Sequence, residues 1–384
     1  MHLTKEEERA LAGKNGEAIA AAYRILAAIG EATDADRLVP VEWAHVSGVN
    51  YNTIGDAGVQ FLEEFSNLAR VAIRTTVNPM GYDADSPDSI PEKFRHEQQK
   101  IVASYQKLGV IPSFTCTPYE VFGVPPKGTQ VSFAESNAAV YSNSVLGLKT
   151  NKESALSALA SSVTGKAPLS ELRIEELRKP RIGIIPGYRF SSELDYGLLG
   201  YFAGKVAKDS SSVSISCEKN TLDRVDAKAL SAGMGTSGSC GMYVIGEAKE
   251  KVGFGIEEKT KLLDELDTSE KGDIIALGSP QLGLDELRLV ASSVQGKKFD
   301  KRCLIFCSRA IYKEAAKIGL AGEIERSGAE VKCDSCTCLT PYVARDRYDS
   351  VTTNSVKSAY YFNHSSKLGV ELKDIKTICE EHTS

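Results

Sequence analysis

The chain has 384 residues, of which 42% are hydrophobic and 25% are charged. This length and apolar content are sufficient for two or three α/β domains with buried cores. The 46 Lys and Arg residues against 51 Asp and Glu residues leave a net charge of −5, so we expect no broad basic surface for nucleic acid or an anionic membrane. The expected ligand is a small molecule.

The beginning of the chain predicts a cytoplasmic protein. Residues 1–8 are a polar helix start rather than a signal peptide, and the sequence contains no run of about 18 apolar residues. We therefore expect the nine cysteines to be reduced, because a reducing compartment keeps thiols free for metal binding, catalysis or packing.

Helices are predicted first, and then strands and helices alternate. Thr4 and Glu7 form a capping box ahead of two amphipathic helices that are separated near residues 13–16. The next predicted elements are a strand at 38–41, a helix at 58–68, a strand at 71–77, a helix at 91–108, a strand at 110–115 and a loop at 122–129. This βαβ order predicts a mostly parallel sheet.

A segment that mixes Pro, Gly and charge, residues 164–180, predicts a linker and a boundary near residue 180. The chain is thereby divided into two α/β regions, 1–180 and 181–384. The strands predicted in the second region lie near 181–185, 213–216, 274–277, 303–306 and 331, with a helix at 308–318. The expected fold is α/β, with mostly parallel sheets flanked by helices.

Three polar motifs follow predicted strands directly. They are Thr75–Pro79, Thr115–Tyr119 and Gly278–Gln281. Because the ligand crevice of an open α/β sheet lies at the carboxyl ends of its parallel strands, these motifs predict one shared site.

The cysteines suggest a metal site without proving one. Cys333, Cys336 and Cys338 fall within six residues after a predicted strand, and Cys116 lies in a comparable loop. Thiolates from separate loops hold iron–sulfur clusters, whereas this spacing lacks the paired C-x-x-C motifs typical of zinc. Metal ligands and ordinary free thiols both remain open, while we expect Cys303 and Cys307, which flank an apolar strand, to be core residues.

Other polar residues also have two interpretations each. The run Met234–Gly241 matches no phosphate-binding fingerprint, and its small residues either bind an oxyanion or let a helix pack closely. His45 is either an acid, base or anion partner, or a structural residue. Lys149 and Lys357 either neutralise a carboxylate or phosphate, or have no such role.

Taken in order, these motifs resemble the aconitase X family, and the resemblance covers nearly the whole chain. The segments that carry it are Leu3–Glu7, Ala44–Gly48, Gly55–Gly58, Thr75–Pro79, Cys116–Tyr119, Glu135–Ala138, Asn143–Gly147, Asp334–Cys336 and Thr353–Tyr360. The resemblance implies an aconitase-like multi-domain body with a cluster site at the domain interface. It also implies a heterodimer, in which a small swivelling-domain subunit completes the active site.

In the family, by this resemblance, three cysteines hold a [4Fe–4S] cluster. Cys116 and Cys336 match two of them, but the third position is Ser279, followed by Gln281 where the family has histidine. The expected metal ligands are therefore Cys116, Ser279 as an alkoxide, and Cys336. The other thiols that could complete the set are Cys338, Cys240 and Cys379, which only a structure can rank.

The resemblance implies a hydro-lyase that converts (R)-5-phosphomevalonate to trans-anhydromevalonate 5-phosphate in a modified mevalonate pathway, with the cluster as Lewis acid. His45 and Lys357 are the expected catalytic residues. The residues expected to bind the phosphorylated hydroxy acid are Asn78, Glu135, Ser136, Asn143, Ser144, Lys149, Ser237, Ser239 and Asn354. The alternatives are a cis-3-hydroxy-L-proline dehydratase and a cluster-free, non-catalytic paralogue.

Overall fold

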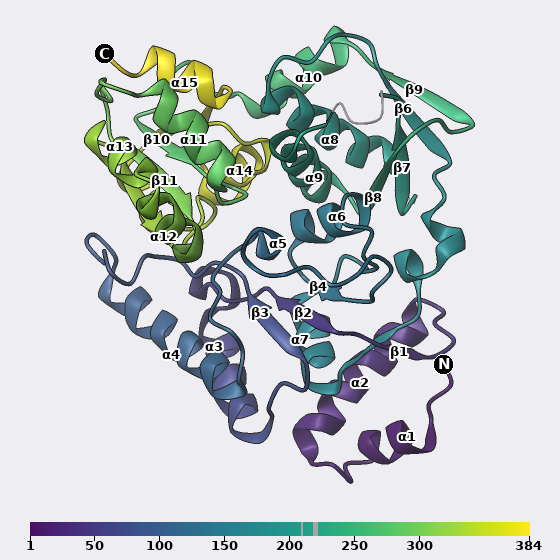
Figure 1. Ribbon diagram of the computed structural model, residues 1–384. Coiled ribbons are helices and arrows are strands. Elements are labelled where there is room, and N and C mark those ends of the chain that lie inside the picture. The colour runs from purple at the N-terminus through teal and green to yellow at the C-terminus, as the bar shows by residue number, and fades with distance from the viewer. Residues whose placement is uncertain (209, 218–221) are drawn as a thin grey trace.

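Three parallel sheets organise the computed structural model, and each is built from a different part of the chain (Figure 1). The structure describes residues 1–208, 210–217 and 222–384. Within these residues the larger sheets contain parallel pairs, and a small two-stranded sheet is antiparallel. The predicted α/β class is confirmed.

The N-terminal unit is built on a sheet of order β3-β2-β4. Its helices are α1 (Lys5–Leu11), α2 (Glu17–Ala32), α3 (Tyr51–Leu68), α4 (Glu92–Leu108), α5 (Pro118–Val121), α6 (Ser136–Ser144) and α7 (Ala155–Thr164). Its strands are β1 (Leu38–Pro40), β2 (Trp43–Val46), β3 (Arg74–Val77), β4 (Ser132–Phe133) and β5 (Lys166–Pro168). The capping box of α1 is confirmed, because the Thr4 and Glu7 side chains satisfy each other's backbone N–H groups.

The strand predicted at residues 110–115 does not form. Pro112 has no N–H to donate, and Phe114 adopts a left-handed φ of 39° that interrupts an extended chain. The segment still runs along β3, because the Ser113 hydroxyl accepts a hydrogen bond from the Val77 N–H at 2.8 Å and donates to the Val77 carbonyl at 2.9 Å. Together with the backbone hydrogen bonds from Ile111 to Thr75 and from Thr115 to Val77, this side chain joins the segment to β3 without a continuous ladder.

Helix α3 begins seven residues before its predicted start at residue 58. The Asn50 side chain caps it by accepting from the Asn52 N–H, and the Gln98 amide oxygen accepts from the Tyr51 N–H. Gly55, with φ of 59°, kinks the helix in its second turn. The kink explains why the apolar periodicity of the sequence is regular only beyond it.

The middle unit is built on a sheet of order β8-β7-β6-β9. Its strands are β6 (Ile182–Pro186), β7 (Ser212–Ile215), β8 (Met242–Ile245) and β9 (Glu250–Phe254), and its helices are α8 (Glu193–Ala207), α9 (Arg224–Ser237) and α10 (Ile256–Leu266). The segment predicted as a linker before it contains β5 and two 3-10 helices, η1 (Glu171–Arg173) and η2 (Glu175–Arg178). The predicted two-region division at residue 180 stays a prediction.

Helices α8 and α9 approach each other closely enough to bring their backbones into contact. A Cβ atom at Gly200 would lie 2.1 Å from the Leu230 carbonyl oxygen, and one at Gly233 would lie 2.0 Å from the Gly197 carbonyl oxygen. Only glycine fits at such distances. We call these three glycines the glycine seam.

The C-terminal unit is built on a sheet of order β12-β11-β10-β13-β14. Its strands are β10 (Ile274–Leu277), β11 (Cys303–Cys307), β12 (Glu330–Cys333), β13 (Ser350–Thr353) and β14 (Gly369–Leu372). Its helices are α11 (Leu284–Ser293), α12 (Arg309–Lys317), α13 (Leu320–Arg326), α14 (Val356–Tyr361), the π-helix η3 (Phe362–Ser366) and α15 (Ile375–Glu381). No helix in the described residues is long and apolar enough to cross a membrane.

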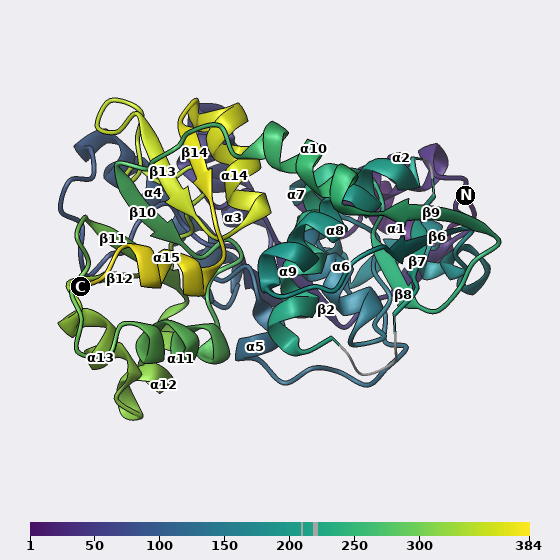
Figure 2. The ribbon, with the colours of Figure 1, turned by 90° about the horizontal axis from the view of Figure 1, so that it is seen from above.

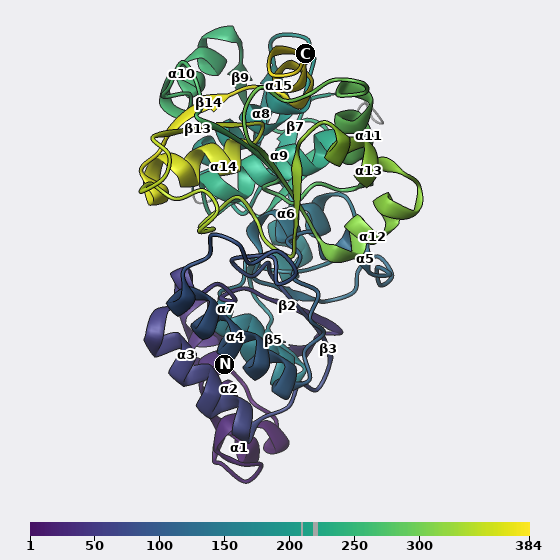
Figure 3. The ribbon, with the colours of Figure 1, turned by 90° about the vertical axis from the view of Figure 1, so that its left-hand side faces the viewer.

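The middle and C-terminal units lie side by side, with the N-terminal unit below both (Figures 2 and 3). Contacts join the units directly, since α9 packs on α6 of the N-terminal unit and on α14 of the C-terminal unit. The Glu193 carboxylate at the start of α8 accepts a hydrogen bond from the Ile375 N–H at 2.7 Å. The three units therefore share one junction.

The Glu193 contact makes the stability of this junction dependent on pH. Burial raises the pKa of Glu193 from 4.5 to about 7, so the folded chain keeps a proton that the unfolded chain releases. The stability supplied by this group is present below pH 4.5 and declines as the pH rises to about 7, by roughly 3 kcal/mol at most. Glu193→Gln removes this dependence while keeping an acceptor for Ile375.

We expect Glu193→Gln to unfold at a higher urea concentration than the parent chain at pH 8 and at a similar concentration at pH 5. Urea titrations at both pH values measure this. Glu257→Gln, on the exposed face of α10, is the matched control and should behave alike at both pH values. A Glu193→Gln chain that is less stable than the parent at pH 8 would show that the carboxylate stabilises the junction in its charged form.

Candidate active site

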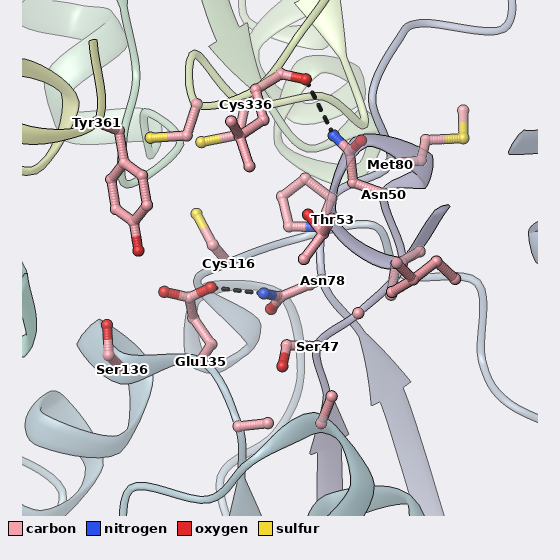
Figure 4. Close-up of a pocket in the computed structure, with 18 of the residues that line it drawn as sticks. Ser47, Asn50, Thr53, Asn78, Met80, Cys116, Glu135, Ser136, Cys336 and Tyr361 are labelled. Atoms are coloured by element: carbon pink, nitrogen blue, oxygen red, sulfur yellow. Dashed lines mark hydrogen bonds between the residues drawn. The ribbon is translucent and has the colours of Figure 1, made fainter. Parts of the chain in front are cut away.

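A cavity of about 390 Å³ lies between the N-terminal unit and the loops of the C-terminal unit. Its lining includes thiols, hydroxyls and amides (Figure 4). It also includes one buried ion pair, Lys357 with Glu135. The polar groups come from segments that follow β2, β3, β4, β12 and β13, at the carboxyl ends of these parallel strands. Two of the three motifs predicted to share a site, Thr75–Pro79 and Thr115–Tyr119, contribute residues to this cavity, whereas Gly278–Gln281 does not line it.

Three thiols meet on one side of this cavity. Cys116 follows the segment beside β3, and Cys336 and Cys338 lie in the loop after β12. Hydrogen bonds from the Cys116 and Cys338 thiols, together with Lys357, hold the pKa of Cys336 well below its usual range. We call these three residues the thiol cluster.

Separate contacts hold the two loops of the thiol cluster. The Gln281 backbone N–H donates to the Cys116 sulfur at 3.1 Å, and the Gln281 amide nitrogen donates to the Ser335 carbonyl at 2.7 Å. Asp334 accepts from the Arg309 N–H at 2.9 Å and from its guanidinium at 2.7 Å. Asp334 and Gln281, which belong to the sequence motifs, therefore hold the loops in place and do not line the cavity.

Ser279, expected to be a metal ligand, lies behind the thiol cluster. Its hydroxyl is 3.1 Å from the Cys338 sulfur, and its carbonyl accepts a hydrogen bond from the Ser355 hydroxyl. Ser279 is 1% exposed and lines a separate cavity of about 20 Å³, together with Asn354. Asn354, expected to bind substrate, is buried there and lies outside the lining of the larger cavity.

The floor of the cavity is a chain of buried polar contacts. The Lys357 ammonium, at the start of α14, pairs with the Glu135 carboxylate and donates to the Asn137 amide oxygen at 2.7 Å. The Asn137 amide nitrogen in turn donates to the Cys116 carbonyl at 2.8 Å. Burial opposes the charge on Lys357, but the Glu135 carboxylate, acting with Cys116, Tyr361 and Cys338, outweighs it, so the pKa of the ammonium group is raised.

His45 lies beneath this floor and is fully buried, outside the cavity lining. Its Nε2 is 2.8 Å from the Asn78 amide oxygen, which can only accept, because the Asn78 amide nitrogen donates to Glu135 at 2.6 Å. Nε2 therefore carries the proton. Its Nδ1 then accepts from the Thr76 hydroxyl at 2.8 Å.

Burial also lowers the pKa of His45 to about 4, against the opposing effect of the Glu135 charge. The imidazole is therefore neutral near pH 7. Of the two interpretations offered by the sequence, the structure favours a residue that positions Asn78 and, through it, Glu135.

Several residues expected to bind substrate lie away from the cavity lining. Asn143 donates to the Thr150 and Gly241 carbonyls, and the Ser144 hydroxyl accepts from the Tyr243 N–H. Lys149 pairs with the exposed Glu175 at 2.8 Å. We assign no substrate role to these three residues.

The run Met234–Gly241 is the end of a helix and not a phosphate-binding loop. The Ser237 hydroxyl donates to the Gly233 carbonyl at 3.2 Å within α9, and the Ser239 hydroxyl donates to the Lys208 carbonyl at 3.1 Å. A helix C-terminus presents carbonyl oxygens, which repel an anion. The close-packing interpretation of this run therefore holds.

The sequence analysis proposed no role in the site for four polar residues of the cavity lining. The side chains of Asn50, Thr53 and Tyr361 reach the cavity, and Ser47 lies beside Asn78 at its edge (Figure 4). Asn50 could have been recognised from the sequence as a helix N-cap, because Asn is common directly before a helix. Tyr361 had none, because it is the second of two adjacent tyrosines on a short helix.

The thiol cluster suits a metal group larger than a single ion. Sulfur ligands of a tetrahedral ion, each about 2.3 Å from the metal, lie roughly 3.8 Å apart. Among the described residues, three possible Cys, His or acidic ligands all lie within 4.8 Å of one another only at Glu371, Glu381 and His382, where Lys373 already pairs with both carboxylates. The three thiols are spaced more widely than this limit, and thiolates from separate loops are ligands that larger metal groups also use.

The fold and the cavity define an aconitase-type body, in which parallel sheets carry a thiol-lined site where their strand ends meet. Family profiles of the aconitase X first, second and third domains match residues 1–176, 179–271 and 272–384. The chain therefore belongs to the aconitase X family.

Individual relatives agree with this assignment. The chain is 35% identical to the phosphomevalonate dehydratase large subunit of Methanocaldococcus jannaschii, over 98% of this chain and 99% of that protein. It is 30% identical to the cis-3-hydroxy-L-proline dehydratase of Hypocrea jecorina, over 94% of this chain and 65% of that protein. The crystal structure of Thermococcus kodakaraensis aconitase X in its holo-form matches all of both chains, with a TM-score of 0.92 and 32% identity.

These relatives are dehydratases, and the chain is accordingly an enzyme of the hydro-lyase class. An aconitase-type family also implies a metal cofactor.

The Lys357–Glu135 pair gives a stability prediction. Removing one member of a buried ion pair leaves an uncompensated charge and costs about 3–5 kcal/mol. We expect Lys357→Met and Glu135→Gln each to lower the free energy of unfolding by about this amount, and the double variant to lose less than the sum. Urea unfolding at pH 7 measures all three.

Lys261→Met, which breaks an exposed pair with Glu257, is the matched control and should leave the unfolding curve almost unchanged. Additive losses in the double variant of Lys357 and Glu135 would show that the two charges do not depend on each other.

The protonation of His45 gives a second prediction. We expect its ring nitrogens to show a neutral imidazole with the proton on Nε2 throughout pH 5.5–8, because burial lowers its pKa to about 4. Nitrogen-15 NMR of the histidine side chains measures this directly. A His45 signal that titrates near pH 6.5, the value of a free histidine, would refute it.

Proposed function

We propose that this chain is the large subunit of a phosphomevalonate dehydratase, which removes water from (R)-5-phosphomevalonate to give trans-anhydromevalonate 5-phosphate in a modified mevalonate pathway. The observation that carries the proposal is the joining of the thiol cluster and the Lys357–Glu135 pair in one cavity. The identity to archaeal large subunits, which extends over nearly their full length, supports this substrate over a hydroxyproline.

The proposed cofactor is a [4Fe–4S] cluster held by Cys116 and Cys336. Both side chains point into the same space from separate loops, as Figure 4 shows, and thiolates are the ligands such clusters require. When bound, a cluster with an open iron supplies a Lewis acid for the substrate hydroxyl.

The side chains of this chain then hold the organic acid. Lys357 uses two of its three N–H groups on Glu135 and Asn137, which leaves one for a substrate carboxylate. The Ser47 and Ser136 hydroxyls line the same cavity and can bind the remaining oxygens. Because Glu135 is held by both Asn78 and Lys357, the ammonium group keeps a fixed direction.

The partner proposed is a small swivelling-domain subunit, in line with the name "large subunit" carried by the relatives. Among the described lining residues, Lys357 is the one Lys or Arg, and Glu135 already balances its charge. The partner is therefore expected to supply the positive charge for the phosphate, and the base that removes the substrate proton. A cytoplasmic location stays a prediction from the sequence.

Activity of the complex tests the proposal. The large subunit is co-purified with its small subunit without oxygen, and loss of water from 5-phosphomevalonate is followed together with iron and sulfide content. We expect about four irons per heterodimer, turnover that a chelator abolishes and that reconstitution restores, and no turnover of cis-3-hydroxy-L-proline. Turnover of the hydroxyproline alone would overturn the substrate assignment.

In the same assay, Lys357→Met should lower kcat/KM by roughly a hundredfold, the effect of removing a buried donor to a developing anion. Lys261→Met, on the surface of α10, is the control and should retain the parent activity. An unchanged kcat/KM in the Lys357 variant, with its fold intact, would remove Lys357 from the site.

A further inference from the structure

We propose that Cys338 is the third protein ligand of the metal cofactor, in place of Ser279. The inference rests on the cluster assigned under the proposed function, and it concerns which side chain of this chain completes the ligand set.

Cys338 belongs to the same cavity as the two ligands already proposed. It lines that cavity with Cys116 and Cys336, whereas Ser279 does not. It follows Cys336 by two residues in the loop after β12, so the same loop brings both thiols to the cavity. The three cysteines thus line one space, with Cys116 reaching it from the N-terminal unit.

The position of Ser279 explains how one residue can replace the other. Its hydroxyl lies 3.1 Å from the Cys338 sulfur, so the thiol occupies the space directly in front of the hydroxyl. The Ser279 carbonyl accepts a hydrogen bond from the Ser355 hydroxyl, and the residue lines the small rear cavity. A hydroxyl there can donate a hydrogen bond to a thiolate at 338, which lowers the negative charge on the sulfur.

The chemistry of the two side chains points in the same direction. A thiol loses its proton far more readily than a hydroxyl, and the thiolate is the form that binds metal. Iron–sulfur clusters are held by thiolates in most proteins. If the Cys338 thiolate binds the metal, the Ser279 hydroxyl can keep its proton.

The other two thiols considered from the sequence lie elsewhere. The Cys240 sulfur contacts the Ser211 and Met242 carbonyls at 3.5 and 3.4 Å, in the core of the middle unit. Cys379 is fully buried in α15, in the hydrophobic core of the C-terminal unit. Neither lines the cavity of the thiol cluster.

The loop that carries Cys336 and Cys338 is held on both sides of the thiols. Before them, Asp334 is fixed by Arg309, and between them the Thr337 hydroxyl lies 2.7 Å from the Ser358 hydroxyl. After them, the Asn52 amide donates to the Leu339 carbonyl at 2.9 Å. Such support keeps two ligands from one loop in place while a metal group binds and leaves.

Iron loading of matched variants tests the assignment independently of catalysis. The chain is reconstituted with iron and sulfide without oxygen, and iron, sulfide and the visible absorption band are measured for the parent, Cys338→Ala, Ser279→Ala and Cys240→Ala. We expect Cys338→Ala to hold at least about tenfold less iron at limiting iron, and the other two variants to match the parent. In Cys338→Ala/Ser279→Cys, iron binding should return.

Circular dichroism of the iron-free variants separates a lost ligand from a lost fold. Full iron content in Cys338→Ala with loss in Ser279→Ala would overturn the assignment and make Ser279 the ligand, while leaving the proposed dehydratase in place. A parent chain that binds no iron would overturn both the assignment and the cofactor on which it rests.

Discussion

The buried pair of Lys357 and Glu135 is the contact on which the site depends, because it joins two units of the chain at the cavity floor. Lys357 comes from α14 of the C-terminal unit, and Glu135 is the residue directly before α6 of the N-terminal unit. Both side chains are about nine-tenths buried, so removing either charge leaves the other without its partner in a poorly hydrated place. Asn137 extends the pair to the Cys116 carbonyl, and Asn78 extends it to His45. One ion pair thus sets the positions of a thiol loop and a neutral imidazole.

Parallel sheets explain why these groups meet. The N-terminal and C-terminal sheets direct their strands, and therefore the polar loops after them, toward the space between these two units, where the cavity lies. The thiols of the cluster come from two units, so the site exists only in the assembled fold. Arg309 holds the loop of Cys336, and Gln281 contacts both thiol loops.

Much of the fold was accessible from the sequence, because apolar periodicity and caps are local signals. The capping box at Thr4, the strands β6 and β10 and the helix α4 were predicted close to their observed bounds. The strand predicted at residues 110–115 was wrong, because Pro112 and the left-handed φ of Phe114 interrupt the extended chain that the composition suggested.

The site was predicted less completely, because a cavity depends on which residues lie close together in space, and spacing along the chain does not show this. Cys116, Cys336, Asn78, Glu135, Ser136 and Lys357 were brought together, and these lie at strand ends. Asn143, Lys149 and Ser237 were also expected to bind substrate, but they make structural contacts away from the cavity. No feature of the sequence told cavity-facing motif residues from structural ones, and none distinguished Cys338 from the remaining thiols.

The glycine seam of α8 and α9 has a consequence for how this sequence can diverge. Helix α9 packs on α8 through the seam, and on its other side Gly235 lies against the first turn of α6, beside the cavity. A larger residue at Gly200 or Gly233 would increase the distance between α8 and α9 and push α9 toward Ser136. The seam therefore acts as a spacer of fixed thickness, so the inner helices of this unit should drift slowly in evolution while its outer strands and surface loops vary freely.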